Sequence, residues 1–147
     1  MTKPAILIAD PDYFGGEGAF ASEVESFDAA GYKTIFGNCI TQDDIISQGA
    51  GAHAILCCNN PVIGMPVFKA LPECRLVFRY GVGYNSVDVE GATREARAVL
   101  FLPGFCTEEL ATHAAGMILD LNRNLSLHDR SIRKGVWEVR EGITPRR

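Results

Sequence analysis

The sequence predicts an α/β protein with a flavodoxin-like five-stranded parallel sheet, helices on both faces, and a long interdomain helix after the sheet. Five short apolar runs, at 5–9, 32–36, 52–58, 76–80 and 98–102, have the length and composition of strands buried on both faces. Segments with helical spacing separate these runs, and strands that alternate with helices form βαβ units around a parallel sheet. The third observation is a long apolar segment with helical spacing at 107–122.

The helices between the strands are marked mainly by their ends. An amphipathic helix is expected from about Phe20, with Gly31 as its stop signal. Thr41 is expected to cap a helix at 42–48, because threonine oxygens accept hydrogen bonds from the first free amides of a helix. Further helices are expected at 67–71, 89–96 and 125–134.

Two parts are expected along the chain, a compact lobe at 1–103 and a helical part at 104–147. Apolar residues cover most of the circumference of the helix at 107–122, so it should be buried on more than one side. One sheet cannot cover both sides of a helix at its edge, and a partner outside the lobe is therefore expected to pack there. The composition of 142–147 is typical of a linker.

Charge and hydropathy exclude two classes of partner. The net charge of −4 provides no basic footprint for nucleic acid or for an anionic membrane. No apolar run reaches the roughly 18 residues of a membrane span. The N-terminus leads directly into the first strand, so no signal peptide is expected. We expect no nucleic-acid partner and no membrane association.

The five cysteines are odd in number and match no zinc or redox spacing. Cys57 and Cys58 are adjacent and cannot form the spaced pair of a metal knuckle. The three histidines are scattered along the chain, and we expect no metal site. Free thiols of this kind indicate a reducing, cytoplasmic location.

A glycine-containing segment follows the fourth expected strand, and we call residues 80–88 the glycine loop. Ligands of doubly wound sheets bind beyond the carboxyl ends of the strands, where this loop is expected to lie. The amides of Val82 and Gly83 could hold a small carboxylate, and Arg79 would add charge. The segment is no dinucleotide fingerprint, because Ser86 stands where the third glycine belongs. A purely structural glycine turn is the alternative.

Three other segments follow strands at the same edge. Residues 58–64, the asparagine loop, offer Asn59 as a binder of a substrate oxygen, although asparagine is also an ordinary turn residue. Asp10 and Asp12 suggest a phosphorylation receiver, but the phosphate-accepting aspartate and the lysine of such domains are missing, so we interpret both as turn and helix-entry residues. Thr107 is expected to be the N-cap of the long helix, whose N-terminus could also help hold a cofactor group.

Two ordered motifs, RYGVGYNSVD at 79–88 and AVLFLPGFCTEELA at 98–111, resemble those of the D-isomer-specific 2-hydroxyacid dehydrogenases. The resemblance covers essentially the whole chain. The segment from Met117 to Trp137 is most similar to the subgroup that includes the C-terminal binding protein corepressors.

The resemblance implies an NAD- or NADP-dependent oxidoreductase that acts on the CH–OH group of a small D-2-hydroxy acid, or reduces the corresponding 2-oxo acid. Residues 1–103 would form the flavodoxin-like substrate-binding lobe, and residues 104–147 the interdomain helices and the start of a linker to an absent Rossmann domain. Val82 and Gly83 would bind the substrate carboxylate with Arg79 nearby. Val82 and Thr107 would lie close to the cofactor.

The family's catalytic arginine, acid and histidine, and its glycine-rich fingerprint, would all follow position 147. We therefore expect a chain that is truncated before the cofactor-binding domain, carries no catalytic residue and is inactive alone. A homo-oligomer is expected, because the apolar helix at 107–122 lacks a cover. The alternative is a non-catalytic binding or regulatory module derived from this family.

Overall fold

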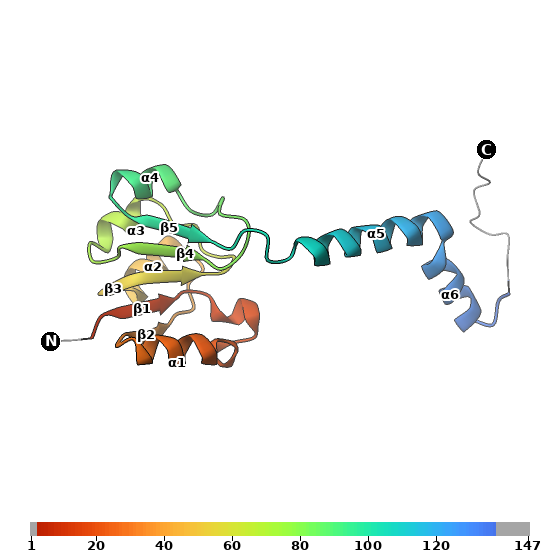
Figure 1. The fold of residues 1–147 in the computed structure, drawn as a ribbon, viewed down its shortest axis with the longest axis horizontal. Coiled ribbons are helices and arrows are strands. Elements are labelled where there is room, and N and C mark those ends of the chain that lie inside the picture. Colours follow the sequence, from red (N-terminus) through yellow and green to blue (C-terminus); the bar gives the residue numbers. More distant parts are fainter. Residues whose placement is uncertain (1–2, 138–147) are drawn as a thin grey trace. The chain divides into compact units, whose positions relative to one another are not determined.

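The computed structural model describes residues 3–137 and divides the chain into two compact units, Met1–Phe105 and Cys106–Arg147. The first unit contains a five-stranded parallel sheet with the strand order β2-β1-β3-β4-β5 (Figure 1). This arrangement confirms the predicted fold class. The strands are β1 (Ala5–Ile8), β2 (Lys33–Phe36), β3 (Ala52–Cys57), β4 (Leu76–Arg79) and β5 (Ala98–Phe101).

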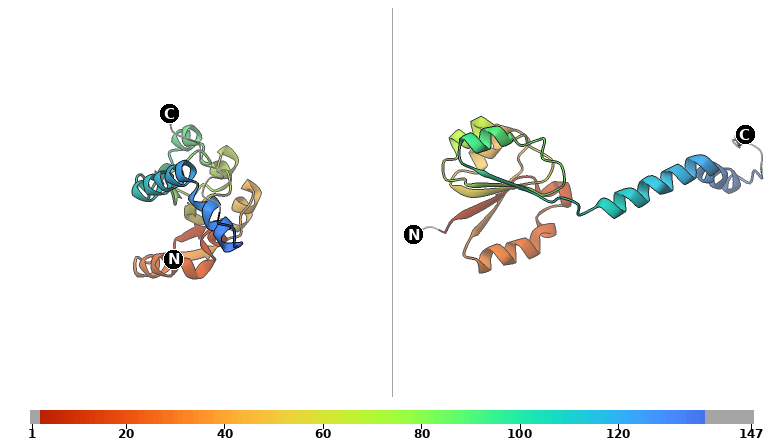
Figure 2. Two further views of the ribbon diagram at one scale, coloured as in Figure 1. Left: turned by 90° about the vertical axis from the view of Figure 1, so that its right-hand side faces the viewer. Right: turned by 45° about the horizontal axis from the view of Figure 1, so that its top comes forward.

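Helices cover the two faces of the sheet unequally (Figure 2). One face packs against α2 (Gln42–Gln48), α3 (Met65–Ala70) and α4 (Val89–Arg94), around a core that includes Leu7, Ile55 and Val77. The other face packs against α1 (Ala21–Ala29) and the turn before it, where Phe20 contacts Ile8 and Leu56. The alternation of side chains along a strand sends neighbouring residues to opposite faces, so each strand contributes to both cores.

The α1 face loses its cover toward the β5 edge. Paired residues Ile8, Leu56, Phe78 and Leu100 form one row across β1, β3, β4 and β5. Ile8 is fully buried, whereas Leu100 is 50% exposed. A single helix spans only part of a five-stranded sheet, which explains why burial falls along the row.

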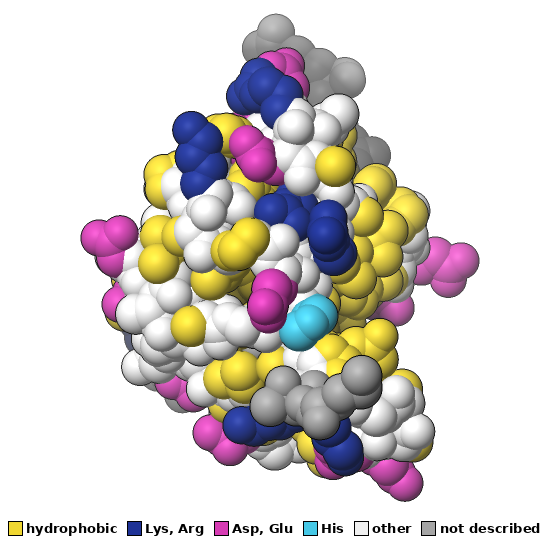
Figure 3. All heavy atoms as spheres, turned by 90° about the vertical axis from the view of Figure 1, so that its left-hand side faces the viewer, with side chains coloured by type: hydrophobic (Ala, Val, Ile, Leu, Met, Phe, Trp, Pro, Cys, Tyr) yellow, Lys and Arg dark blue, Asp and Glu magenta, His cyan; other side chains and the backbone are white. Residues whose placement is uncertain are grey.

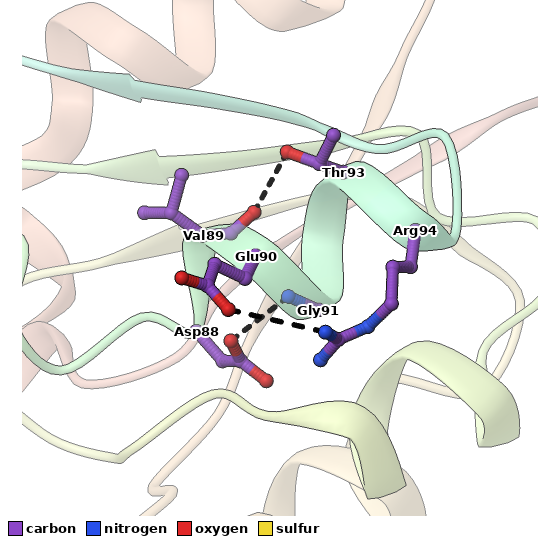
Figure 4. A network of polar contacts seen from close by, with 6 residues as sticks. All are labelled: Asp88, Val89, Glu90, Gly91, Thr93 and Arg94. Atoms are coloured by element: carbon purple, nitrogen blue, oxygen red, sulfur yellow. Dashed lines mark hydrogen bonds and ion pairs between the residues drawn. The ribbon is translucent and has the colours of Figure 1, made fainter.

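Local signals define the starts of α2 and α4. Thr41 caps α2 as predicted, in a capping box in which Thr41 and Asp44 satisfy each other's backbone amides. The Asp88 carboxylate caps α4 by accepting a 2.8 Å hydrogen bond from the Gly91 amide (Figure 4). On the solvent side of α4, Arg94 forms a 3.9 Å ion pair with Glu90. The cap fixes the point at which the glycine loop ends.

Two 3-10 helices, η1 (Pro11–Phe14) and η2 (Glu17–Phe20), occupy the segment after β1, where the sequence predicts a loop. Gly15 and Gly16 lie between them with φ values of 97° and 101°, a region that favours glycine. This pair of turns brings Phe14 and Phe20 against Tyr80, with ring centroids 5.7 and 6.0 Å apart.

The second unit contains α5 (Thr107–Arg123) and α6 (Leu125–Arg133), which are joined at Asn124 in the left-handed conformation. The prediction that Thr107 is the N-cap of the long helix is wrong. Cys106 occupies that position, because the turn before the helix places Thr107 already in its first helical position. Within this unit the apolar side chains of α5 are exposed. No helix within residues 3–137 combines the length and apolar character that a membrane crossing requires.

Figure 3 shows the first unit from the side of the strands' amino ends. Basic and acidic side chains are interspersed there with apolar ones, and neither charge gathers into a continuous patch among the coloured residues. This pattern is typical of an ordinary solvated surface. The candidate site lies at the opposite edge of the sheet.

Candidate functional site

The candidate site is built from loops that leave the carboxyl ends of adjacent strands. Cys57 of β3 pairs with Arg79 of β4, and Arg79 pairs with Phe101 of β5. Two further hydrogen bonds continue this alignment beyond the strands, from the Tyr80 amide to the Cys57 carbonyl and from the Leu102 amide to the Gly81 carbonyl. The glycine loop is therefore held between its two neighbours at the edge where such folds bind ligands.

The glycine loop begins with a tight turn, in which the Gly81 amide donates to the Arg79 carbonyl at 2.9 Å. Beyond it, the amides of Val82 and Gly83 donate no hydrogen bond to any residue in the described part of the chain. Both residues are exposed, and the Val82 side chain is 44% accessible. Two successive amides in exposed residues, without an acceptor among residues 3–137, can donate to an anion without losing an existing bond.

Arg79 lies over the start of this loop. A Cβ atom built on Gly81 would overlap the Arg79 guanidinium, so glycine at this position makes room for the arginine. The ion pairs among residues 3–137 are Arg94–Glu90 and Arg133–Asp129, and neither involves Arg79. A half-buried guanidinium that forms no ion pair with a described residue is suited to bind an anionic ligand in the two-pronged geometry that arginine offers.

The asparagine loop has the opposite character, because its first amides are already occupied. The buried Asp10 carboxylate accepts hydrogen bonds from the amides of Cys58, Asn59 and Asn60, at 2.7, 2.8 and 2.9 Å. Asn59 and Asn60 keep their side chains exposed. Asp10 thus fixes the backbone from which Asn59 projects.

Asp10 stands at the N-cap position of η1, as the helix-entry interpretation predicts, but it also has a role that the interpretation missed. Its side chain makes no capping bond to η1 and instead accepts from the Cys58 amide, just after β3. Sequence reasoning missed this contact because 48 residues separate Asp10 from Cys58. The available signal was topological: in a doubly wound sheet β1 and β3 are neighbours, so residues after both strands meet at one edge.

The far end of the asparagine loop is tied to the far end of the glycine loop. Ile63 and Val87 form an isolated parallel bridge, with 2.8 Å hydrogen bonds from Ile63 to Ser86 and from Asp88 to Ile63. Both bridge residues are buried in the main core. The two loops are consequently anchored at both ends, and the exposed residues between the anchors are held in a defined arrangement.

The two cysteines at the end of β3 are free thiols with raised pKa values. Burial, followed by the Asp10 charge, raises the pKa of Cys57 to about 12, against a smaller opposing effect of Arg79. The same causes raise the pKa of Cys58. Both thiols are therefore protonated near neutral pH and are poor nucleophiles. Residues 3–137 contain no cluster of histidine, cysteine, aspartate or glutamate suited to hold a metal ion.

Four of the five residues singled out from the sequence lie at the carboxyl ends of the adjacent strands β3 and β4 or in the loops that follow them. Arg79, Val82 and Gly83 belong to one continuous segment, and Asn59 stands at the end of the neighbouring strand. Thr107 begins α5 in the second unit, and its role toward a cofactor stays a prediction.

Comparison with known proteins identifies a family for the chain. The family model described as the D-isomer specific 2-hydroxyacid dehydrogenase catalytic domain matches residues 17–144. A glyoxylate reductase of Korarchaeum cryptofilum is 34% identical over 95 residues, which are 65% of this chain and 29% of that protein. A D-3-phosphoglycerate dehydrogenase of Mycobacterium bovis is 28% identical over 138 residues, or 94% of this chain and 25% of that protein.

Solved structures agree. The NADPH-dependent glyoxylate/hydroxypyruvate reductase of Sinorhizobium meliloti, in complex with NADP and malonate, superposes with a TM-score of 0.70 at 27% identity, covering 98% of this chain and 42% of that one. A glyoxylate reductase of Paecilomyes thermophila gives a TM-score of 0.74 at 18% identity, which shows the shared fold over 98% of this chain and 45% of that chain. The chain spans 29% and 31% of the length of the first two curated relatives it matches.

Proposed function

Because the chain belongs to the D-isomer specific 2-hydroxyacid dehydrogenase family, we propose that it forms the substrate-binding part of an NAD(P)-dependent oxidoreductase. The substrate is a small D-2-hydroxy acid or the corresponding 2-oxo acid. In this proposal the backbone amides of Val82 and Gly83 bind the substrate carboxylate, and Arg79 neutralises its charge. The side-chain amide of Asn59 contacts a substrate oxygen.

One observation carries the proposal: two amides and a guanidinium, none of which has a hydrogen-bond acceptor or carboxylate partner among residues 3–137, occur together at the carboxyl end of β4. A carboxylate needs both, because its two oxygens accept hydrogen bonds and its charge must be compensated on leaving water. Most of the donors in the site are backbone amides. Such donors suit a small ligand, because they bind its carboxylate and make no contact with the rest of the ligand.

The cofactor would supply the chemistry of hydride transfer to or from C2 of the substrate. Val82 fits one part of that role, because its exposed side chain and free amide stand next to the proposed carboxylate position and can form one wall against a nicotinamide ring. Thr107 would lie near the cofactor at the start of α5. The segment that binds most of the dinucleotide is, in this proposal, separate from residues 1–147.

Finer assignments belong to the same proposal. The cofactor of this proposal is NAD or NADP. The S. meliloti relative is an NADPH-dependent enzyme in complex with NADP, which supports NADP. Similarity of 117–137 supports a position near the C-terminal-binding-protein-like subgroup. Five free thiols in the first 106 residues support a cytoplasmic location without nucleic-acid or membrane partners. The 147 residues alone are proposed to lack turnover, because no catalytic histidine is assigned among them.

Amide spectra of the isotopically labelled chain test the carboxylate site. Pyruvate and glyoxylate should shift the amide signals of Val82 and Gly83 most, whereas methyl pyruvate, which lacks the charged carboxylate, should leave them in place. Shifts centred elsewhere, or equal shifts with methyl pyruvate, would remove the basis of the proposal. Turnover of either acid with NADH or NADPH by the 147 residues alone would overturn the assignment of the chemistry to another segment.

Self-association through α5 is the proposed oligomeric contact. Leu110, Met117 and Ile118 are more than half exposed within the second unit. Burying about 500 Å² of apolar surface on each partner would contribute roughly 25 kcal/mol before association costs of about 4 to 15 kcal/mol are subtracted. Sedimentation should find a dimer or larger species for the parent chain and a folded monomer for the Met117→Lys, Ile118→Lys double variant. A parent chain that stays monomeric at high concentration contradicts the proposal.

A further inference from the structure

The edge of the sheet carries two sets of successive backbone amides, and they differ in one respect. The amides of Cys58, Asn59 and Asn60 are satisfied by a carboxylate from the chain itself, whereas those of Val82 and Gly83 have no partner among residues 3–137. Both sets follow adjacent parallel strands, so both would attract an anion if left open. The difference comes from one side chain, Asp10.

We propose that Asp10 is a positioning residue that occupies the anion-binding amides of the asparagine loop and thereby directs the substrate carboxylate to the glycine loop. This inference rests on the proposed function, since it concerns where the substrate carboxylate binds. Asp10 touches no substrate in this arrangement. It excludes a competing anion site and holds the backbone from which Asn59 projects.

The geometry gives each carboxylate oxygen a defined task. Oδ1 of Asp10 accepts from Cys58, and Oδ2 accepts from both Asn59 and Asn60. A neutral asparagine at position 10 has one acceptor oxygen. It can therefore accept either from the Cys58 amide or from the amides of Asn59 and Asn60, but not from all three. An alanine satisfies none and leaves a space lined by three donors, which is the size and chemistry of a small carboxylate site.

The negative charge of Asp10 affects which result should be expected when Asp10 is replaced. Removal of the Asp10 charge would strengthen the attraction of any anion to nearby Arg79, so weaker binding at Val82 is not the expected outcome. The expected outcome is a change in the number and location of bound carboxylates, from one site to two. A residue with a merely structural role would not create a second carboxylate site on removal.

The experiment uses amide spectra and hydrogen exchange of the full 147-residue chain and its Asp10→Ala and Asp10→Asn variants. Without ligand, Asp10→Ala should speed exchange of the amides at 58–60 by about tenfold or more, because their charged acceptor is gone. The amides of Ile63 and Val87, which donate to the carbonyls of Ser86 and Tyr84, serve as internal controls and should keep the parent rates. Formate at tens of millimolar should restore protection at 58–60 in Asp10→Ala and do nothing in the parent chain.

Pyruvate then reports the positioning role. In the parent chain it should shift Val82 and Gly83 alone, and in Asp10→Ala it should shift 58–60 as well. Shifts confined to Val82 and Gly83 in Asp10→Ala, with no formate effect, overturn the inference and leave the proposed function standing. Absence of shifts at Val82 and Gly83 in the parent chain overturns the proposed function itself.

The Asp10→Asn variant provides a second test that does not depend on the folding of Asp10→Ala. Its amide fills the same space, so formate should have no effect, and exchange should speed up at one or two of the three amides. Unchanged exchange at all three amides in Asp10→Asn would show that the carboxylate does not hold the loop.

Discussion

The asparagine loop and the glycine loop start from the same situation and reach opposite states. Each follows a parallel strand, at paired positions Cys57 and Arg79, and each presents successive backbone amides at the ligand-binding edge. The asparagine loop is closed internally by Asp10, and its flanking thiols are held neutral by burial and by that negative charge. In the glycine loop the amides of Val82 and Gly83 have no partner among residues 3–137, and Arg79 directly precedes the loop at the end of β4.

We infer that the end of a strand is open to a ligand where the rest of the protein leaves its backbone amides without an acceptor. Amides after a strand are common, and most are satisfied by the protein itself. Here β1 supplies an acceptor to β3 and none to β4, since β4 is not its neighbour in the sheet. In our proposal the anion site lies at the end of β4, where no described residue supplies an acceptor for the amides of Val82 and Gly83.

The largest expected effect comes from removing the positive charge of Arg79, at the start of the glycine loop. Arg79→Gln should weaken pyruvate binding by about 1.5–3 kcal/mol, or roughly 10- to 150-fold, because a charge-assisted hydrogen bond is lost. Isothermal titration measures the affinity. The matched control is Arg94→Gln, which removes the same charge from an exposed ion pair on α4 and should change the affinity less than twofold. Equal losses in both variants would indicate a general charge effect.

A smaller effect should follow from filling the space beneath the arginine. Gly81→Ala places a Cβ atom where the Arg79 guanidinium lies, so the arginine must move and affinity should fall about tenfold. Gly83→Ala meets only the Asn85 side-chain oxygen, at 3.3 Å, and should cost about threefold. Thermal unfolding checks that both variants remain folded. A larger loss for Gly83→Ala would move the site away from Arg79.

Local signals explain why most of the fold could be predicted. The buried strands are continuous apolar runs, and the Thr41 capping box is complete within four residues of sequence. Parallel pairing follows from the alternation of strands and helices, because the crossover rule leaves few topologies. The glycine loop was placed at the correct edge for the same reason.

Features that depend on distant partners could not be predicted. The bond between Asp10 and the asparagine loop needs the relative register of β1 and β3, which no local pattern encodes. The sequence also does not distinguish free amides from satisfied ones. It therefore leaves two alternatives open for each loop, a site that binds substrate through Val82 or Asn59, or an ordinary structural turn. The shift of the N-cap from Thr107 to Cys106 is a local error, caused by a turn that reaches one residue further.

Asn59 and Asn60 offer a comparison within the asparagine loop. Both donate a backbone amide to Asp10 Oδ2 and expose their side chains, so alanine at either position preserves the backbone bonds. Asn59→Ala should weaken pyruvate binding about threefold, the effect of one neutral hydrogen bond. Asn60→Ala should leave it unchanged, because the proposed contact to substrate involves Asn59 alone. A larger effect at Asn60 would reassign the contact.

The smallest expected effect is the pH dependence that the buried thiols confer on stability. The pKa of Cys57 rises from 9.0 to about 12 on folding, and that of Cys39 to about 11, in both cases mainly through burial. The folded state therefore holds these protons more tightly than the unfolded state. Their contribution is complete below pH 9 and is lost as the pH rises toward 11 or 12.

At pH 9 half of each thiol is ionised in the unfolded chain, so each buried thiol should lower the free energy of unfolding by roughly 0.4 kcal/mol relative to pH 7. Denaturant unfolding between pH 7 and 9.5 measures this slope. Cys57→Ala should reduce the slope by the share of one thiol. Asp10→Asn should alter it far less, because burial outweighs the Asp10 charge as the cause of the raised pKa of Cys57. A large change of this slope in Asp10→Asn would mean that the Asp10 charge, and not burial, is the main cause of the raised thiol pKa values. The asparagine loop would then differ from the glycine loop in charge more than in hydrogen bonding.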